Sequence, residues 1–411
     1  MTAVESGVLV PRPDHVPVDR VFDIDMYNLE GIDEHGYLEA WKAVQDRGVP
    51  DLVWTPRNGG HWVATSGAQI REIYTDPEHF SSRVIFIPKA AGEKYAMVPS
   101  KMDPPQHRPY RQVVDRGLNL RSVRAMSEAI RAEAASLIDA FVGDGECDFV
   151  EQFSGEFPIR VFMRMADLPM RDALMLRAHA SAMTRPAGTT PEEMAEALDQ
   201  ANGALFDYVS PIIDQRIGGD GTDLISVTVN GTIDGQPMSR DKMLGMVALL
   251  LLAGLDSVTN FMNMVMDYLG RNPDKVAQLV DDPEEIKRAV EELFRRFPLV
   301  AAARMVAGDI ERDGVLLKEG EMVLLPTPLH GLDERINPEP WQVDFRRERI
   351  SHSTFGDGPH RCAGLHLARL EVIVMLEEWL KRIPRFQVAQ GTRPTYRAGV
   401  VAEVAGVRLT W

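Results

Sequence analysis

The spacing of apolar residues predicts a chain that is mostly helical. Apolar side chains recur every three or four positions in four long stretches, which is the period of a helix that buries one face. The expected helices cover residues 122–142, 191–217, 283–296 and 364–382. Glycines follow the first two of these stretches, as is common where helices end.

A minor β portion is predicted beside these helices. Two short β-type runs, 51–55 and 61–65, flank Asn58-Gly59-Gly60, an order that is typical of a hairpin with a tight turn. Four more short strands are expected near Val306, Val323, Phe386 and Val407. The fold class is therefore expected to be mainly α with a minor β portion.

One further helix is expected over about 239–271, with Ser239 as its N-cap. Its segment 244–255 is apolar on nearly all sides, so this helix should cross the middle of the protein. The apolar run has 12 residues and is too short to span a bilayer. The first 30 residues form a proline-containing arm, and no linker or repeat divides the rest. We therefore expect a single domain over 1–411.

Composition narrows the class of protein. The chain has 411 residues and a net charge of −16, with 45 Lys and Arg against 61 Asp and Glu. This acidic balance argues against a protein that grips nucleic acid or anionic lipid. No apolar secretory signal opens the chain, so a cytoplasmic protein without a membrane partner is expected. The two cysteines, Cys147 and Cys362, exclude a disulfide framework and a cysteine-rich metal cluster.

Cys362 stands in a glycine-rich setting. It closes the sequence Phe355-Gly-Asp-Gly-Pro-His-Arg-Cys, and another glycine follows at 364. The glycines permit a tight loop before the last expected helix. A thiolate at that helix N-terminus would receive backbone N–H groups, which lower the thiol pKa. From the cysteine alone, a buried structural thiol is an equal alternative.

The central helix carries polar residues where its apolar run ends. Gly254 in mid-helix costs about 1 kcal/mol of helix stability relative to alanine. Asp256 and Ser257 are also costly to bury in an apolar helix unless hydrogen bonds or a function compensate for that cost. We therefore expect a local opening of the helix at this point. On another helix, Glu292 and Arg295 are spaced i, i+3, so a charge-assisted pair can form. Taken alone, such a pair is most often on the surface.

These motifs together resemble the cytochrome P-450 superfamily. The string F-G-x-G-x-H-x-C-x-G over 355–364 matches its haem-ligand loop, and Glu292-Leu-Phe-Arg295 matches its E-x-x-R motif. The segment 253–257 is similar to its oxygen-activation motif. Short segments such as Met102-Asp-Pro-Pro105 also resemble the bacterial camphor 5-monooxygenase subfamily, and this resemblance extends over nearly the whole chain. The resemblance implies a triangular helical domain with small β-sheets, and a monooxygenase that uses haem b (iron protoporphyrin IX).

The same resemblance implies a role for each matching residue. Cys362 would be the axial ligand of the haem iron, Asp256 would relay protons, and the Ser257 hydroxyl would hydrogen-bond dioxygen. The haem propionates would be bound by Arg111, Arg304 and His360. A buried structural triad would consist of Glu292, Arg295 and Arg347. The substrate pocket would be lined by Tyr95, which would hold a ketone oxygen, and by Phe86, Met183, Thr184, Leu249, Leu252, Val300 and Val400.

Several departures from the camphor-type pattern bear on the substrate. Leu252 and Ala253 are each larger than the residues of that pattern. Ala302 and Ala96 each replace an aspartate, and Ser257 replaces a threonine. One or two methylenes change discrimination between substrates by roughly 1–3 kcal/mol. We therefore expect a compact terpenoid or norisoprenoid ketone, either camphor-like or ionone-like.

The two electrons that the reaction needs must come from another protein, since the chain has no G-x-G-x-x-G nucleotide fingerprint. The resemblance implies a [2Fe–2S] ferredoxin with its NADH-dependent reductase as partners, and a monomeric enzyme. The basic residues expected on the docking face are Arg71, Arg108, Arg111, Arg349 and Arg361.

Two alternative functions share this fold. One is a haem-thiolate binding or sensor protein without turnover, which has no need of a proton relay. The other is a peroxide-dependent hydroxylase, a variety that usually lacks the acid–alcohol pair. Asp256 and Ser257 therefore favour a monooxygenase over both.

Overall fold

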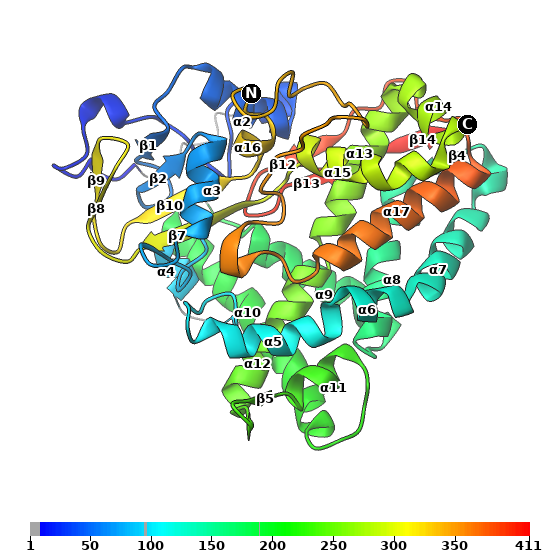
Figure 1. Ribbon diagram of the computed structural model, residues 1–411, viewed down its shortest axis with the longest axis horizontal. Helices are drawn as coiled ribbons and strands as arrows, with labels where there is room; N and C mark the ends of the chain where they lie inside the picture. Colours follow the sequence, from blue (N-terminus) through cyan, green and yellow to red (C-terminus); the bar gives the residue numbers. More distant parts are fainter. Residues whose placement is uncertain (1–8, 94–96, 189) are drawn as a thin grey trace.

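The computed structural model describes residues 9–93, 97–188 and 190–411. Helices fill most of the molecule, and the largest sheet lies with the N-terminal segments at one corner (Figure 1). The expectation of a mainly α fold with small sheets is confirmed. The outline narrows away from that sheet, towards the short hairpin of Thr232–Ile233 and Gln236–Pro237, β5 and β6 (Figure 1).

The helices before residue 170 are short or of medium length, with α2 following directly on α1 and α7 on α6. They are α1 (Ile32–His35), α2 (Tyr37–Asp46), α3 (Gly67–Thr75), α4 (Lys89–Glu93), α5 (His107–Leu118), α6 (Leu120–Ala125), α7 (Ser127–Asp139) and α8 (Phe157–Met165). Single turns add η1 (Val18–Arg20), η2 (Val142–Asp144) and the π-type η3 (Val150–Ser154). The helix expected over 122–142 is thus divided, with one boundary at Met126.

The later helices include the longest ones. They are α9 (Ala173–Thr184), α10 (Pro191–Arg216), α11 (Leu224–Val229), α12 (Arg240–Gly254), α13 (Ser257–Arg271), α14 (Pro273–Asp281), α15 (Ile286–Arg296), α16 (Pro328–Gly331) and α17 (Leu365–Arg382). Single turns form η4 (Met170–Asp172), η5 (Pro283–Glu285) and η6 (Gly358–His360). The helices expected over 191–217, 283–296 and 364–382 are confirmed within a few residues, and Thr190 with Glu193 forms a capping box on α10.

The main sheet has five strands in the order β1-β2-β10-β7-β3. Its strands are β1 (Leu52–Thr55), β2 (His61–Ala64), β3 (Phe80–Ser81), β7 (Ala301–Val306) and β10 (Met322–Pro326). The predicted hairpin is confirmed: β1 and β2 pair antiparallel, and Asn58, Gly59 and Gly60 all have positive φ. β10 then joins β2 in parallel, so distant parts of the sequence share one sheet.

The remaining strands form small sheets. β4 (Glu146–Asp148), β11 (Gln387–Val388) and β14 (Arg408–Thr410) make a three-stranded one, in the order β11-β14-β4. Two-stranded pairs are β8 (Ile310–Arg312) with β9 (Val315–Leu317), and β12 (Thr395–Arg397) with β13 (Glu403–Ala405). Strands therefore occur at or beside all four positions expected near residues 306, 323, 386 and 407.

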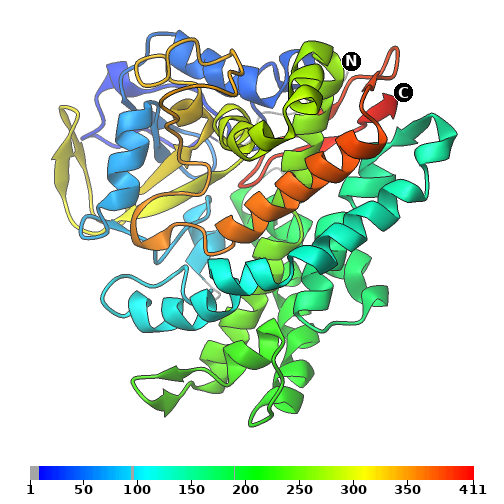
Figure 2. The ribbon, with the colours of Figure 1, turned by 45° about the vertical axis from the view of Figure 1, so that its right-hand side comes forward.

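Buried apolar side chains form one continuous cluster that reaches from Val16 to Leu409. Its largest members include Trp379 on α17, whose ring lies 5.4–6.1 Å from those of Phe149, Phe153, Phe386 and Trp411. Burying one such aromatic side chain stabilises a fold by roughly 1.5–3 kcal/mol. α17 runs alongside α7 in both views, so this packing fixes the helix that follows Cys362 (Figures 1 and 2).

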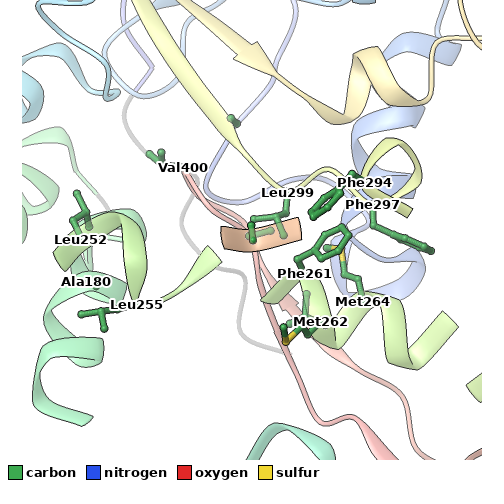
Figure 3. Packing of buried hydrophobic residues seen from close by; sticks show 14 of the residues in the cluster. Ala180, Leu252, Leu255, Phe261, Met262, Met264, Phe294, Phe297, Leu299 and Val400 are labelled. Carbon is green, nitrogen blue, oxygen red and sulfur yellow. The ribbon is translucent and has the colours of Figure 1, made fainter. Parts of the chain in front are cut away.

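The expected central helix is divided into α12 and α13, because Leu255 and Asp256 leave the helical path. The opening predicted beside Gly254 is therefore present. Taken together, Arg240–Arg271 is long and apolar enough to cross a membrane, but 67% of its most apolar window is buried inside the protein. Figure 3 shows Leu252 and Leu255 beside Ala180 on one side of the break, and Phe261 of α13 beside Phe294 on the other.

Candidate active site

The loop before α17 holds Cys362 by backbone contacts. The Cys362 N–H donates to the Phe355 carbonyl at 2.7 Å, which closes the loop on itself. Gly356 and Gly358 adopt φ of 65° and 67°, a region that favours glycine. A Cβ on Gly358 would also lie 2.6 Å from the Tyr74 carbonyl oxygen, so the loop packs tightly on α3. The backbone conformation and the close packing on Tyr74 therefore both require glycine at position 358.

The Cys362 side chain is accessible, yet the surrounding chain partly desolvates its thiol. This burial raises the thiol pKa, although the Gly364 N–H and the nearby Arg111, Arg361 and Arg369 act in the opposite direction. The expectation that the helix N-terminus would lower the thiol pKa is therefore wrong in its net sign, because desolvation outweighs the backbone donor.

The side chains expected to bind haem propionates lie close to one another and have unmet hydrogen-bonding capacity. Arg304 is buried on β7, donates to the Ala303 carbonyl at 2.9 Å, and has no salt bridge to a carboxylate among the described residues. His360 has a buried Nε2 without a hydrogen-bond partner in the described part of the chain. Burial next to Arg304 lowers the pKa of His360 to about 3. Arg304 and His360 therefore both lack an anionic partner in the described structure.

His107 was not expected at this place. Its ring lies 4.2 Å from that of His360, and burial beside Arg111 lowers its pKa to about 4. Arg111 itself bonds Asp115 at 2.7 Å and the Pro359 carbonyl at 3.3 Å. With an accessible thiol and these donors, the residues present fit a haem that carries propionates and is ligated by sulfur.

Asp256 lies at the break of the central helix and is 4% exposed. Its Oδ2 is 2.8 Å from Nη1 of Arg185, the residue that follows α9, and 3.5 Å from Oγ1 of Thr184. The Asn260 side chain donates to the Asp256 Oδ1 at 3.1 Å and to the Asp256 carbonyl at 3.0 Å. The carboxylate is thus buried among polar partners that belong to two different helical segments.

Gly254 has a packing reason that the sequence did not reveal. A Cβ at this position would lie 2.3 Å from the Phe162 ring of α8. The glycine therefore lets α8 and α12 approach each other, in addition to weakening the helix before the break. Directly after the break, Ser257 is the first residue of α13 and is half-buried.

One face of α12 is accessible although the helix is mostly buried. Ala253 is exposed and Leu249, one turn earlier, is half-buried. Positions four residues apart share a face, so both side chains border the same space as the end of the apolar run. Within 244–256, the other residues that are not buried are Leu244 and Gly254.

The other expected pocket residues come from several elements that backbone bonds tie together. The Val400 N–H donates to the Thr184 carbonyl at 3.0 Å, and the Ala301 N–H donates to the Val400 carbonyl at 2.9 Å. Val300 forms an isolated bridge with Val401. Buried members of the expected set are Phe86, Met183, Thr184, Leu252 and Val400. Tyr95 and Ala96 lie outside the described residues.

The three residues of the expected structural triad meet in the core. Glu292 and Arg295 are fully buried, with Arg295 Nη2 and Nε at 2.7 and 2.8 Å from the two carboxylate oxygens. Arg347 Nε donates to the same carboxylate at 3.0 and 3.1 Å. Arg295 also donates to the carbonyls of Gly331, Pro340 and Gln342 at 2.8–3.1 Å, so the cluster fastens the loop that leads to Cys362.

Aromatic rings connect the central helix with that loop. Phe261 of α13 stacks on Phe294 of α15 at 4.2 Å, and Phe294 lies 4.7 Å from Phe355 (Figure 3 labels the first two). The Arg369 guanidinium lies 5.3 Å above the Phe355 ring. The position of the thiol loop is therefore set by packing as well as by its own glycines.

The basic residues expected on the docking face differ in exposure. Arg71, Arg108, Arg349 and Arg361 are exposed, while Arg111 is half-buried. The second cysteine, Cys147, is 5% exposed on β4. Burial raises its thiol pKa to about 12, which makes it an unreactive core residue.

Sequence reasoning missed Arg185, Asn260 and His107. Asn260 could have been found, because it stands one helical turn after Asp256. Arg185 carries no local signal that predicts its contact, since its partner lies on a different helix. A basic residue at the C-terminus of α9, directly after Thr184, is favourable for the helix dipole alone and therefore does not indicate a partner.

Comparisons with known proteins agree with this geometry. The family model described as Cytochrome P450 matches residues 173–397. The probable cytochrome P450 127A1 of Sinorhizobium fredii is 31% identical over 98% of this chain and 97% of its own. The crystal structure of CYP101J2 is 37% identical with a TM-score of 0.87, and that of CYP101C1 is 35% identical with a TM-score of 0.88. Each covers 98% of this chain and 100% of the solved one. Other relatives are named as hydroxylases and monooxygenases.

Proposed function

The chain belongs to the cytochrome P450 family and resembles the CYP101 type, and on that premise we propose that it hydroxylates a compact terpenoid or norisoprenoid ketone. The family is one of haem-dependent monooxygenases, in which haem iron held by a cysteine thiolate supplies the chemistry that activates dioxygen. The observation that carries the proposal is Asp256, buried with polar partners where the central helix opens.

Four residues would hold the haem. Cys362 provides the sulfur ligand, and the accessible, desolvated position of its thiol suits that role. Arg304 and His360 provide donors for the propionates, because both are buried with unmet hydrogen-bonding capacity. Arg111 sits beside them, though it already shares its guanidinium with Asp115. His107 packs on His360 and would keep that ring in place.

Asp256 and Ser257 would handle protons during turnover. Asp256 can accept and release a proton at Oδ1 or Oδ2, and its contacts with Arg185 and Asn260 hold the carboxylate at the break. The Ser257 hydroxyl can donate one hydrogen bond from the first turn of α13. A relay of this type contributes roughly a hundredfold or more to a rate. This pair favours turnover over a binding or sensor role.

The substrate would lie against the accessible face of α12. Leu249 and Ala253 offer only apolar contact there, and Thr184 and Val400 belong to segments that are bonded to each other. A pocket of this kind orients its ligand mainly by shape, with few polar groups. Tyr95 would then supply the hydroxyl that orients a ketone oxygen. A compact, largely apolar ketone fits this combination.

A substrate screen would test the proposal. Camphor, cineole and ionones would be added to the haem-loaded protein, with the spin-state shift as the readout and product identification to follow. We expect tight binding of one ketone class and a single oxygen atom in the product. Tyr95→Phe should weaken binding of a ketone more than that of its deoxy analogue. Equal losses for both would contradict the role given to the tyrosine hydroxyl.

We also propose that a [2Fe–2S] ferredoxin, reduced by its NADH-dependent reductase, delivers the electrons to a monomeric cytoplasmic enzyme. The support is a set of exposed arginines around the Cys362 loop, Arg71, Arg108, Arg349 and Arg361, in a chain with a net charge of −16. Opposite charge on a partner speeds encounter more than it raises affinity. The basic distribution thus suits an acidic donor.

Charge reversal at one position would test this docking face. Arg108→Glu should slow reduction by the ferredoxin strongly at low salt and weakly at high salt, because surface charges are screened. Arg385→Glu, an equal change at an exposed site just beyond the far end of α17, provides the matched control. A loss that does not depend on salt, or an equal loss in the control, would rule out steering by this face.

A further inference from the structure

A surface cleft of about 440 Å³ opens between α3, α15, α17 and the loop over 347–361. It is lined by five arginines and three carboxylates, in a protein whose total charge is strongly negative. Its volume falls in the range of small-molecule sites. We call it the arginine cleft. The lining arginines are Arg71, Arg288, Arg347, Arg361 and Arg369.

Two of these arginines are bound by carboxylates, although Arg347 shares its carboxylate with Arg295. Arg347 belongs to the Glu292 cluster, and Arg369 binds Glu291 through two bonds of 2.6 and 2.8 Å. Within the described structure, Arg288 donates only to the carbonyls of residues 346 and 347. Arg71 and Arg361 are exposed and make no salt bridge among the described residues. The guanidinium groups of Arg71, Arg288 and Arg361 therefore have no carboxylate partner in the described structure, and they can bind an anionic ligand.

The acidic side chains of the cleft offset this charge only in part. Glu291 is held by Arg369, and Glu348 is exposed. Asp357 accepts a hydrogen bond of 2.6 Å from the Ser353 hydroxyl. That serine also lies 2.6 Å from Nδ1 of His330, whose Nε2 is 3.0 Å from the Ser351 hydroxyl. The Asp357 carboxylate is thus turned into an internal chain of hydrogen bonds that orders the wall of the cleft.

A neutral donor completes the lining. Burial lowers the pKa of His352 to about 3, so its ring is neutral. Its Nδ1 accepts the Thr354 N–H at 3.2 Å, which leaves the proton on Nε2. A neutral imidazole N–H and several guanidinium forks are donors of the kind that bind oxyanions.

We propose that the arginine cleft binds a small multivalent oxyanion of the phosphate class. A diphosphate or a phosphate ester fits the space better than a single phosphate group, because the cleft holds about 440 Å³. Arginine forks grip phosphate oxygens bidentately, which a lone chloride cannot exploit. Arg71 and Arg361 also belong to the proposed docking face, but binding of the anion does not depend on that proposal.

Calorimetric titration of the haem-loaded protein with pyrophosphate would test the site, at an ionic strength held constant with sodium chloride. We expect saturable binding of one anion per chain. Arg71→Gln and Arg288→Gln should each weaken it about tenfold, the worth of one charge-assisted hydrogen bond. Arg346→Gln is the matched control, since Arg346 is exposed on the neighbouring loop and pairs with Glu285 at 2.7 Å. It should change affinity less than about twofold.

Three outcomes would overturn the proposal. They are the absence of saturable binding, equal losses in all three variants, and sulfate binding as tightly as pyrophosphate. A titration with adenosine monophosphate separates the two sources of ligand: tighter binding than pyrophosphate identifies a phosphate ester, and weaker binding a free diphosphate. The ferrous–CO absorption of each variant shows that it is folded with haem. Since the titration measures neither turnover nor reduction, its failure is distinguishable from failure of the proposed function.

Discussion

Two buried carboxylate–guanidinium pairs of this protein differ in how completely hydrogen bonds satisfy them. Glu292 accepts hydrogen bonds from Arg295, Arg347 and the Asp344 N–H. The remaining N–H groups of Arg295 donate to three backbone carbonyls. The pair of Asp256 with Arg185 is less complete. Arg185 Nε has no hydrogen-bond partner in the described structure, and the Thr184 contact with Asp256 is long, at 3.5 Å.

Under the proposed function, this difference corresponds to a structural pair and a working one. A buried pair whose donors and acceptors are all occupied is costly to break and has no group left to exchange. A pair with a spare donor can change partners at small cost. Arg185 has such an alternative, since Glu403 lies 3.7 Å from its Nε. The proposed function therefore assigns proton transfer to Asp256 and a structural role to Glu292.

The largest effect is expected from removing the complete pair. Arg295→Met would leave the Glu292 carboxylate buried without its main partner, which costs about 3–5 kcal/mol. We expect a loss of this size in the free energy of unfolding measured with urea, and poor retention of haem. Lys287→Met, an exposed position on the same helix, is the control and should change stability little. A loss below about 1 kcal/mol for Arg295→Met would remove the contrast between the pairs.

Next is the working pair, where the expected loss is in rate. Asp256→Asn keeps the shape of the side chain and removes the group that exchanges protons, so turnover should fall about a hundredfold. The ferrous–CO absorption and the substrate-induced spin shift should stay as in the parent enzyme. Unchanged turnover would show that protons reach the site without Asp256. A large loss of stability would place Asp256 with the structural pair instead.

The break between α12 and α13 is tested by Gly254→Ala. The new methyl would meet Phe162 at 2.3 Å, and overpacking of this kind costs about 1–3 kcal/mol. Phe162→Leu in the same chain should recover part of that loss. Gly203→Ala is a matched control within α10, since its added Cβ would meet nothing within 4 Å, and it should be neutral or stabilising. Equal losses at 254 and 203 would mean that packing on Phe162 is unimportant.

The smallest effect is expected at Glu403, the alternative partner of Arg185. Glu403→Gln removes a partly exposed charge at 3.7 Å and should cost less than about 1 kcal/mol of stability. It should, however, make the Arg185–Asp256 contact harder to open, so turnover should fall by a few-fold. Stopped-flow measurement of a single turnover would detect this. A rate identical to that of the parent enzyme would argue against a change of partners.

Local signals were enough for much of this fold. Periodicity placed α10, α15 and α17, and the glycine pair at 59–60 placed the first hairpin. The cost of Gly254 and Asp256 in an apolar helix predicted the opening between α12 and α13. These features depend on residues that are neighbours in the chain, so a single sequence contains the relevant physics.

Features that depend on distant contacts were not accessible in the same way. The Asp256 partner Arg185 follows a different helix, and the packing of Gly254 on Phe162 joins α12 to α8. The sign of the Cys362 pKa shift was misjudged because it is a balance between a local donor and burial by the whole fold. Only the three-dimensional structure decides which of the two is larger.

The parallel pairing of β2 with β10 has a consequence for biosynthesis. The hairpin of β1 and β2 is complete at Ala64, but its neighbour in the sheet begins at Met322. At ribosomal rates of about 5–20 residues per second, the open edge of β2 waits on the order of 10–50 s for its partner. During that interval it is a template for pairing with other nascent chains. Yield in a host cell should therefore depend on translation speed and chaperone supply as much as on the stability of the finished enzyme.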